Sequence, residues 1–234
     1  NGESSAISWA YRMPPMIQVK DIAGNYAGTR NIMGNAQNPI FILDKNQNDK
    51  ARQFNASGNL YAKVKILPGL SAKTLFGANY YSYNNKDINY VEKGHAERGT
   101  YDYLYETGNF SRQWNWTNTI DYNKTFGSHN LSVIIGTEAI DYRYNKMYAT
   151  RYDYFLKTPN YIQLSTGLQG QANSGYLTQW SLFSEFGRIN YSYADKYLVE
   201  AVVRRDGSSR FAKNYRYGIF PAFSLGWRIS NEPF

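Results

Sequence analysis

Apolar and polar side chains alternate with a period of two along much of this chain. From residue 54 to residue 66 every even position is apolar or glycine, and the odd positions carry Asn, Ser, Tyr and Lys. A period of two is typical of a β-strand with one apolar and one polar face. At about 3.3 Å per residue, this run is long enough to cross a bilayer, which needs about 9–11 tilted residues.

The same alternation recurs in six further segments and predicts about seven strands. The further segments begin near Leu70, Trp114, Leu131, Tyr176, Tyr197 and Tyr217. The segment 176–193 is the least regular, because Glu185 shares a face with Phe183 and Ile189. Since the strands follow one another through turns, we predict an all-β fold with antiparallel strands.

Short and long connections between these segments also alternate. Short turns are predicted at 68–69, 126–129 and 194–196, and long polar segments at 84–109, 145–175 and 206–216. This is the plan of an outer-membrane β-barrel, which has tight periplasmic turns and larger external loops. Asp206-Gly207 is a tight-turn signal, because glycine accepts a positive φ.

The chain divides into two regions on this pattern. Residues 1–50 do not alternate and are rich in loop dipeptides, so we expect one long extracellular segment without a helix. Residues 51–234 are expected to supply the transmembrane strands and their loops. Because bacterial barrels have an even number of at least 8 strands, we expect this sequence to be part of a larger chain.

Composition narrows the function classes. The 23 Tyr, 12 Phe and 5 Trp favour strands and membrane-interface belts. Without Cys there is no disulfide framework and no thiol nucleophile. The net charge of +8 is scattered rather than clustered, so we expect no nucleic-acid partner.

Tyrosines in the predicted long connections are candidates for stacking on sugar rings. Packing between loops and an interfacial belt explain them equally well, and both alternatives stay open. The tyrosines in question are Tyr80, Tyr81, Tyr83, Tyr101, Tyr103, Tyr105, Tyr152 and Tyr154.

No catalytic or metal constellation stands out, so we predict neither enzymatic activity nor a cofactor. His95 and His129 are far apart and lack a nucleophile context, and His129 is interpreted as a turn residue. Four carboxylates have no spacing that selects a pair: Glu97, Glu106, Glu138 and Glu185. The segment Asp44–Asp49 resembles the start of a calcium loop but lacks its glycine, so a solvated loop is favoured.

The most specific motif lies between residues 204 and 232. Arg204-Arg205-Asp206-Gly207-Ser208-Ser209-Arg210-Phe211 is followed by Phe220-Pro221 and then by Gly226-Trp227-Arg228-Ile229-Ser230. These residues resemble the run R-x-D-G-S-S-R-F, F-P-x-x-S-x-G-W-R-I-S-x-E of the SusC/RagA family of TonB-linked outer-membrane proteins. Weaker matches extend the resemblance over most of the chain, whereas residues 1–37 match only loosely.

The resemblance implies a transporter of the cell outer membrane with a 22-stranded, plugged barrel, of which this chain is part of the C-terminal half. Family members import glycan or peptide fragments, are powered through TonB, and work with a SusD-like surface lipoprotein that caps the mouth. The plug and the TonB box are N-terminal in the family, and we expect neither here. Coupling to the TonB complex is therefore expected through a region outside this chain.

The motif residues are interpreted as a structural hairpin, in which Arg204, Arg205 and Arg210 form a charge network around Asp206. Direct contact with substrate or lipopolysaccharide is the alternative, and no ligand-binding residue is assigned. The residues of this structural signature are Arg204, Arg205, Asp206, Gly207, Ser208, Ser209, Arg210, Phe211, Phe220, Pro221, Gly226, Trp227 and Arg228.

Strand alternation further predicts which polar residues face a barrel lumen: Lys63, Lys65, Lys73, Gln113, Glu200 and Arg204. Two rivals remain open. One is another TonB-dependent receptor, such as a siderophore receptor, or a passive porin. The other is a soluble carbohydrate-binding β-sandwich, in which Leu60, Val64, Val199 and Leu225 pack against a second sheet.

Overall fold

The computed structural model describes residues 5–29, 33–91 and 101–233. Two short helices, α1 (Ala6–Arg12) and α2 (Pro39–Asn46), precede the strands. The seven strands are β1 (Lys50–Leu67), β2 (Leu70–Asn89), β3 (Tyr103–Phe126), β4 (His129–Tyr152), β5 (Gln169–Tyr193), β6 (Tyr197–Ser208) and β7 (Tyr217–Trp227). Two short 3-10 helices follow β6 and β7, at Lys213–Tyr215 (η3) and Ile229–Asn231 (η4).

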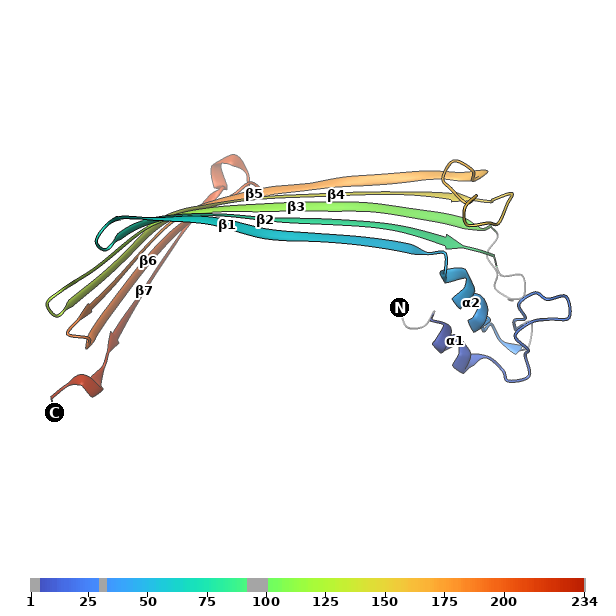
Figure 1. Cartoon of the computed structure of the whole chain (residues 1–234), viewed down its shortest axis with the longest axis horizontal. Helices are drawn as coiled ribbons and strands as arrows, with labels where there is room; N and C mark the ends of the chain where they lie inside the picture. The colour runs from blue at the N-terminus through green and yellow to red at the C-terminus, as the bar shows by residue number, and fades with distance from the viewer. Residues whose placement is uncertain (1–4, 30–32, 92–100, 234) are drawn as a thin grey trace. The chain divides into compact units, whose positions relative to one another are not determined.

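The strands form one antiparallel sheet in which their spatial order is their sequence order (Figure 1). The predicted all-β class and the count of seven strands are therefore confirmed. Successive antiparallel neighbours place the turns β1–β2, β3–β4 and β5–β6 at one end of the sheet, and the β2–β3 and β4–β5 connections at the opposite end. The β6–β7 connection follows Ser208, which lies opposite Leu182 near the middle of β5. Gly69 and Gly127 form two of the short turns with φ of 83° and 58°, a backbone conformation that glycine adopts without strain.

The chain splits into two compact units. The described residues of 1–53, 82–109 and 146–176 form one unit, which contains both helices and a small apolar core. That core consists of Ile88, Leu104, Tyr154 and Ile162. The second unit comprises residues 54–81, 110–145 and the described residues of 177–234, and it carries the sequence motif.

The second unit is apolar on its exposed face. Along β6 exposure alternates, so that Val199 and Val203 are 42% and 49% exposed, whereas Glu200 and Arg204 are partly buried. The register places Tyr191 and Leu225 opposite Val199, which continues the apolar face across three strands. Exposed apolar surface is unfavourable in water, so this sheet requires an apolar medium on that face.

Two helices appear in the region where none was predicted, so that expectation is wrong. Helix α2 begins at Pro39, and the side chain of Asn38 accepts hydrogen bonds from the backbone N–H of Ile40 and Phe41. An Asn N-cap followed by Pro at the first helical position is a strong start signal. No helix among the described residues is long and apolar enough to cross a membrane.

Helix α2 also argues against the calcium loop. Asp44 and Lys45 lie inside the helix, and a carboxylate oxygen of Asp44 accepts a hydrogen bond from the hydroxyl of Tyr26. The Asp49 carboxylate accepts from the backbone N–H of Ile88 at 2.9 Å. Within the described residues no group of three His, Cys, Asp or Glu side chains is arranged to hold a metal ion.

The predicted tight turn at Asp206-Gly207 is wrong, because β6 continues to Ser208 and pairs Asp206 with Gly218. Gly207 lies opposite Tyr217, and a Cβ at this position would lie 2.4 Å from Cε1 of that ring. The glycine is therefore needed for a close approach rather than for a positive φ. The strands next to the other long connections also extend further than predicted, to Asn89 and Tyr152.

Candidate functional site on the polar face of the sheet

Polar side chains of β5, β6 and β7 gather on the face opposite the apolar one. The register aligns Asn190 with Glu200 and Glu200 with Ser224, and it aligns Ser184 with Asp206. All of these residues are offset by one position from the exposed apolar residues of their strands. Alternation therefore gives the sheet one polar and one apolar face, as the sequence predicted.

Arg204 is the centre of this polar face. Its Nη2 lies 3.1 Å from Oε1 of Glu138, and its Nε lies 2.6 Å from Oδ1 of Asp206. Its guanidinium also lies over the ring of Phe186, 5.5 Å from the centroid. One side chain thus joins β4, β5 and β6.

The other two arginines of the predicted network do not share this site. Arg205 lies one position further along β6, and its Nη1 contacts Oε2 of Glu185 at 2.7 Å. Because successive strand residues point to opposite faces, Arg205 lies on the apolar side, where it covers the ring of Tyr217 at 4.0 Å. Arg210 instead lies over Trp180, 5.1 Å from its centroid. The predicted single network of three arginines around Asp206 is therefore wrong.

The serines and Phe211 organise the connection from β6 to β7. Ser209 Oγ accepts a hydrogen bond from the N–H of Ser181 at 2.8 Å, and Ser208 Oγ accepts from the N–H of Arg210. The carbonyl of Phe211 accepts from Nε of Arg216. These contacts are those of a fixed turn, as local Ser hydrogen bonds commonly make.

Further motif residues lie in β7. Phe220 faces Arg204, and Pro221 lies opposite Val203. A Cβ on Gly226 would lie 3.3 Å from Cβ of Leu198, so glycine allows close strand approach.

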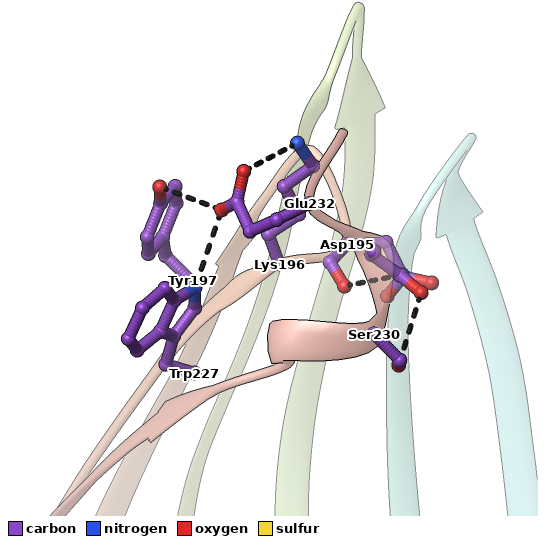
Figure 2. A network of polar contacts seen from close by, with 7 residues as sticks. Asp195, Lys196, Tyr197, Trp227, Ser230 and Glu232 are labelled. Carbon is purple, nitrogen blue, oxygen red and sulfur yellow. Dashed lines mark hydrogen bonds and ion pairs between the residues drawn. The ribbon is translucent and has the colours of Figure 1, made fainter. Parts of the chain in front are cut away.

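The end of the motif forms a second polar cluster at the short-turn end of β5, β6 and β7 (Figure 2). Glu232 accepts hydrogen bonds from Lys196 Nζ at 3.0 Å, from Tyr197 OH at 2.9 Å and from Trp227 Nε1 at 3.2 Å. These donors, Lys196 foremost, lower the pKa of Glu232 below its usual value. Nearby, Arg228 pairs with Asp195 at 2.7 Å.

An aromatic cluster occupies the apolar face at the same end. The His129 Nδ1 lies 2.7 Å from the hydroxyl of Tyr191, and its ring stacks on Phe126 and contacts Tyr193. His129 was predicted to be a turn residue, whereas it opens β4 as part of this cluster. Aromatic rings with one polar atom are enriched at membrane interfaces. His95 and Glu97 lie outside the described residues.

A shallow groove of about 680 Å³ runs along the polar face near the short turns. Its lining includes Asn130, Ser192, Glu200 and Ser224. On β1, Lys63 and Lys65 point to the same face as Tyr61, because strand side chains alternate. The ring of Tyr61 lies 5.2 Å from Nζ of Lys73 on β2, so the three lysines share one face. On β3, Gln113 points to the same face as Thr117. The hydroxyl of Thr117 donates a hydrogen bond of 3.4 Å to Glu138, so Gln113 lies on the face that carries Glu138.

Several of the tyrosines proposed for sugar stacking contact other aromatic rings. Tyr103 packs edge-on against Tyr152, and Tyr105 lies 5.6 Å from Tyr148 between ring centroids. Tyr154 is buried in the apolar core, where burial raises its pKa to about 12. Packing within the protein therefore accounts for Tyr103, Tyr105, Tyr152 and Tyr154.

Comparison with known proteins shows sequence relatives over the whole chain. It is 32% identical to the TonB-dependent receptor P3 of Formosa agariphila, over 100% of this chain and 23% of the relative. It is 29% identical to the TonB-dependent receptor SusC of Bacteroides thetaiotaomicron, over 85% of this chain and 19% of SusC. The chain is homologous to one stretch of the TonB-dependent receptors, SusC among them. No family model matches.

The solved structure of the RagAB peptide transporter agrees on the fold. It superposes with a TM-score of 0.73 at 21% identity, covering 88% of this chain and 23% of that chain. The predicted resemblance, the β-barrel strands and the outer-membrane location are confirmed. The chain spans about a quarter or less of the length of the relatives it matches.

A double-mutant cycle tests the Arg204 site. Because Arg204 and Glu138 are only partly exposed, at 37% and 28%, we expect Glu138→Gln and Arg204→Gln to show a coupling energy of about 1 kcal/mol in detergent unfolding. The matched cycle on Asp195 and Arg228, which are 64% and 45% exposed at the short-turn end, should give less. Equal coupling in both cycles would contradict the central role of Arg204.

The Glu232 cluster predicts an acid-sensitive turn. A carboxyl group whose pKa is lowered by folding stabilises the folded state above its unfolded pKa, and this contribution is lost as the pH falls through the folded value. A spin label at Ser230→Cys should therefore gain mobility as the pH falls below 4.5, the ordinary Glu value. In the Glu232→Gln variant the label should already be more mobile at neutral pH, and its mobility should not change as the pH falls.

A label at Lys213→Cys, in the η3 turn, is the control for this titration. It should not respond over the same range, because Glu232 contacts Lys196, Tyr197 and Trp227 at the short-turn end only. An identical response at both labels would mean that global acid unfolding, not Glu232, is being observed.

Proposed function

We propose that this chain forms part of a gated outer-membrane barrel that imports nutrients too large for simple porins, namely glycan or peptide fragments. Residues 51–234 supply transmembrane strands and loops, and residues 1–50 form an extracellular segment. The apolar face of the sheet contacts lipid and the polar face lines the lumen. Passage is non-covalent: substrate is bound by polar side chains and released, with no catalytic step.

The observation that supports this proposal most strongly is that the sheet exposes its apolar side chains. Leu60, Val64 and Leu225 are 79%, 60% and 81% exposed, although a water-soluble protein buries such residues. The rival β-sandwich requires these residues to pack against a second sheet, and the described residues form only one. A lipid environment removes the cost of this exposure.

Energy and partners are proposed from the relatives. TonB-dependent receptors are named for TonB, and we infer that energy coupling comes from a region outside this chain. The likeness to the RagAB peptide transporter and to SusC supports a SusD-like surface lipoprotein over the mouth. The long connections lie at the end that this orientation places outside the cell, where such a lipoprotein would bind.

Purification from the native outer membrane tests this function. We expect the protein to require detergent, to have an intact mass about four times that of this chain, in line with the 23% coverage of the relative P3, and to carry a lipoprotein partner. A species of 27.0 kDa that is soluble without detergent would refute the proposal. Loss of glycan or peptide uptake on deletion, with porin-sized solutes unaffected, separates import from a passive pore.

Lys introduced on the lipid face should destabilise the barrel. Val64→Lys is expected to cost about 2–4 kcal/mol if this position lies at the bilayer midplane, because an ammonium group is then moved into hydrocarbon. Asn59→Lys, on the polar face of the same strand, is the matched control and should change stability little. Unfolding in lipid vesicles measures both, and near-wild-type stability of Val64→Lys would contradict the assigned facing.

A further inference from the structure

A basic groove crosses β1 to β5 within the first unit, at the end of the long connections. Its volume is about 740 Å³, and its charged lining consists of Lys50, Arg52, Lys86 and Glu106. Three basic side chains against one carboxylate leave the groove with an excess of positive charge. Such a groove attracts an anion.

The two basic residues of β1 lie at the margin of the apolar face. Lys50 and Arg52 have the parity of Phe54 on the same strand, so alternation directs all three to one side. Both are exposed, and no ion pair within the described residues includes either of them. Their charges are therefore available to a ligand outside the sheet.

Lys86 is held in place from the connection between β4 and β5. Its Nζ donates a hydrogen bond of 2.7 Å to the carbonyl of Ile162, which is fully buried. Ile162 packs with Ile88 and Leu104 in the apolar core. A carbonyl does not neutralise an ammonium group, so Lys86 is fixed beside the groove with its charge retained.

The uncharged lining completes the chemistry. Asn84, Asn173 and Ser174 offer amide and hydroxyl donors, while Met147 and Leu164 offer apolar surface. Cationic and amide donors together recognise phosphate oxygens, and Arg does so in a bidentate manner. An amphiphile with a phosphorylated headgroup satisfies both parts of this lining.

We propose that this groove binds a phosphate group of the anionic glycolipid of the outer leaflet. The inference rests on the proposed orientation, in which the apolar face meets lipid and the long connections are external. At the upper edge of the lipid-facing residues of β1, Arg52 and Lys50 then lie at headgroup level. Anionic headgroups attract Lys and Arg at a membrane surface, and contact there anchors the barrel in its leaflet.

The experiment compares two double variants of the complete protein in phosphatidylcholine nanodiscs. Lys50→Gln with Arg52→Gln removes two charges from the groove, and Lys63→Gln with Lys65→Gln removes two from the opposite face of the same strand. Titration with diphosphoryl lipid A should show binding weakened on the order of tenfold in the first variant only. A third variant, Lys50→Arg with Arg52→Lys, keeps both charges and should bind like the wild type.

Each other result overturns the proposal. Equal loss in the first two variants would mean that net charge alone attracts the lipid, and no loss in the first would remove the groove from the interaction. Loss in the charge-conserving variant would contradict an electrostatic site. Full displacement of lipid A by an equal concentration of inorganic phosphate would assign the groove to free phosphate instead of lipid.

Uptake by the same variants separates this inference from the proposed function. If lipid A binding depends on Lys50 and Arg52 but the protein has no uptake activity, the lipid site is supported and the proposed import is refuted. Normal uptake without lipid A binding would refute the lipid site alone.

Discussion

Contact between the apolar face of the sheet and an apolar medium is the interaction on which this structure depends. A sheet of seven strands in water buries its apolar side chains against a second layer, yet here residues such as Phe223 and Leu225 are more than 80% exposed. At about 25 cal/mol per Å² of apolar surface, leaving such a face in water is strongly unfavourable. Lipid supplies the missing layer, and the polar face is thereby left for the inside of a barrel.

The two ends of the strands are stabilised in different ways. At the end of the long connections, Ile88, Leu104, Tyr154 and Ile162 form an apolar core, and buried Asp102 pairs with Lys157. At the short-turn end there is no comparable burial among the described residues, and polar contacts of Glu232 join the β5–β6 turn to the end of β7. The end with the long connections thus resembles a small soluble domain, whereas the other end relies on hydrogen bonds and on contacts between aromatic rings.

Arg204 is held in place by other residues of the polar face and is still partly exposed. Its contacts with Glu138, Asp206 and Phe186 tie three strands together, while its side chain remains 37% exposed. Ion pairs of this exposure contribute little stability individually. Their effect is to fix the positions of charges on the polar face of the sheet.

The sequence predicted the features that depend on alternation, and it missed those that depend on contacts between distant segments. The facing of Val199 and Glu200 follows from a period of two, as does the separation of Arg204 from Arg205, which the motif interpretation overlooked. Helix α2 had a readable start at Asn38-Pro39, but its eight residues are too few for a periodic signal. The burial of Tyr154 and the three donors around Glu232 arise from tertiary packing, which no local pattern encodes.

Site-directed spin labelling of β7 tests the central claim most directly, because this chain has no cysteine of its own. Single labels from residue 217 to residue 227 in the membrane-embedded protein report collisions with oxygen, which is concentrated in lipid, and with a water-soluble nickel chelate. We expect the two accessibilities to alternate out of phase with a period of two, with oxygen favoured at 219, 223 and 225. Uniform accessibility, or oxygen favoured at 218, 224 and 226, would contradict the assignment of the apolar face to lipid.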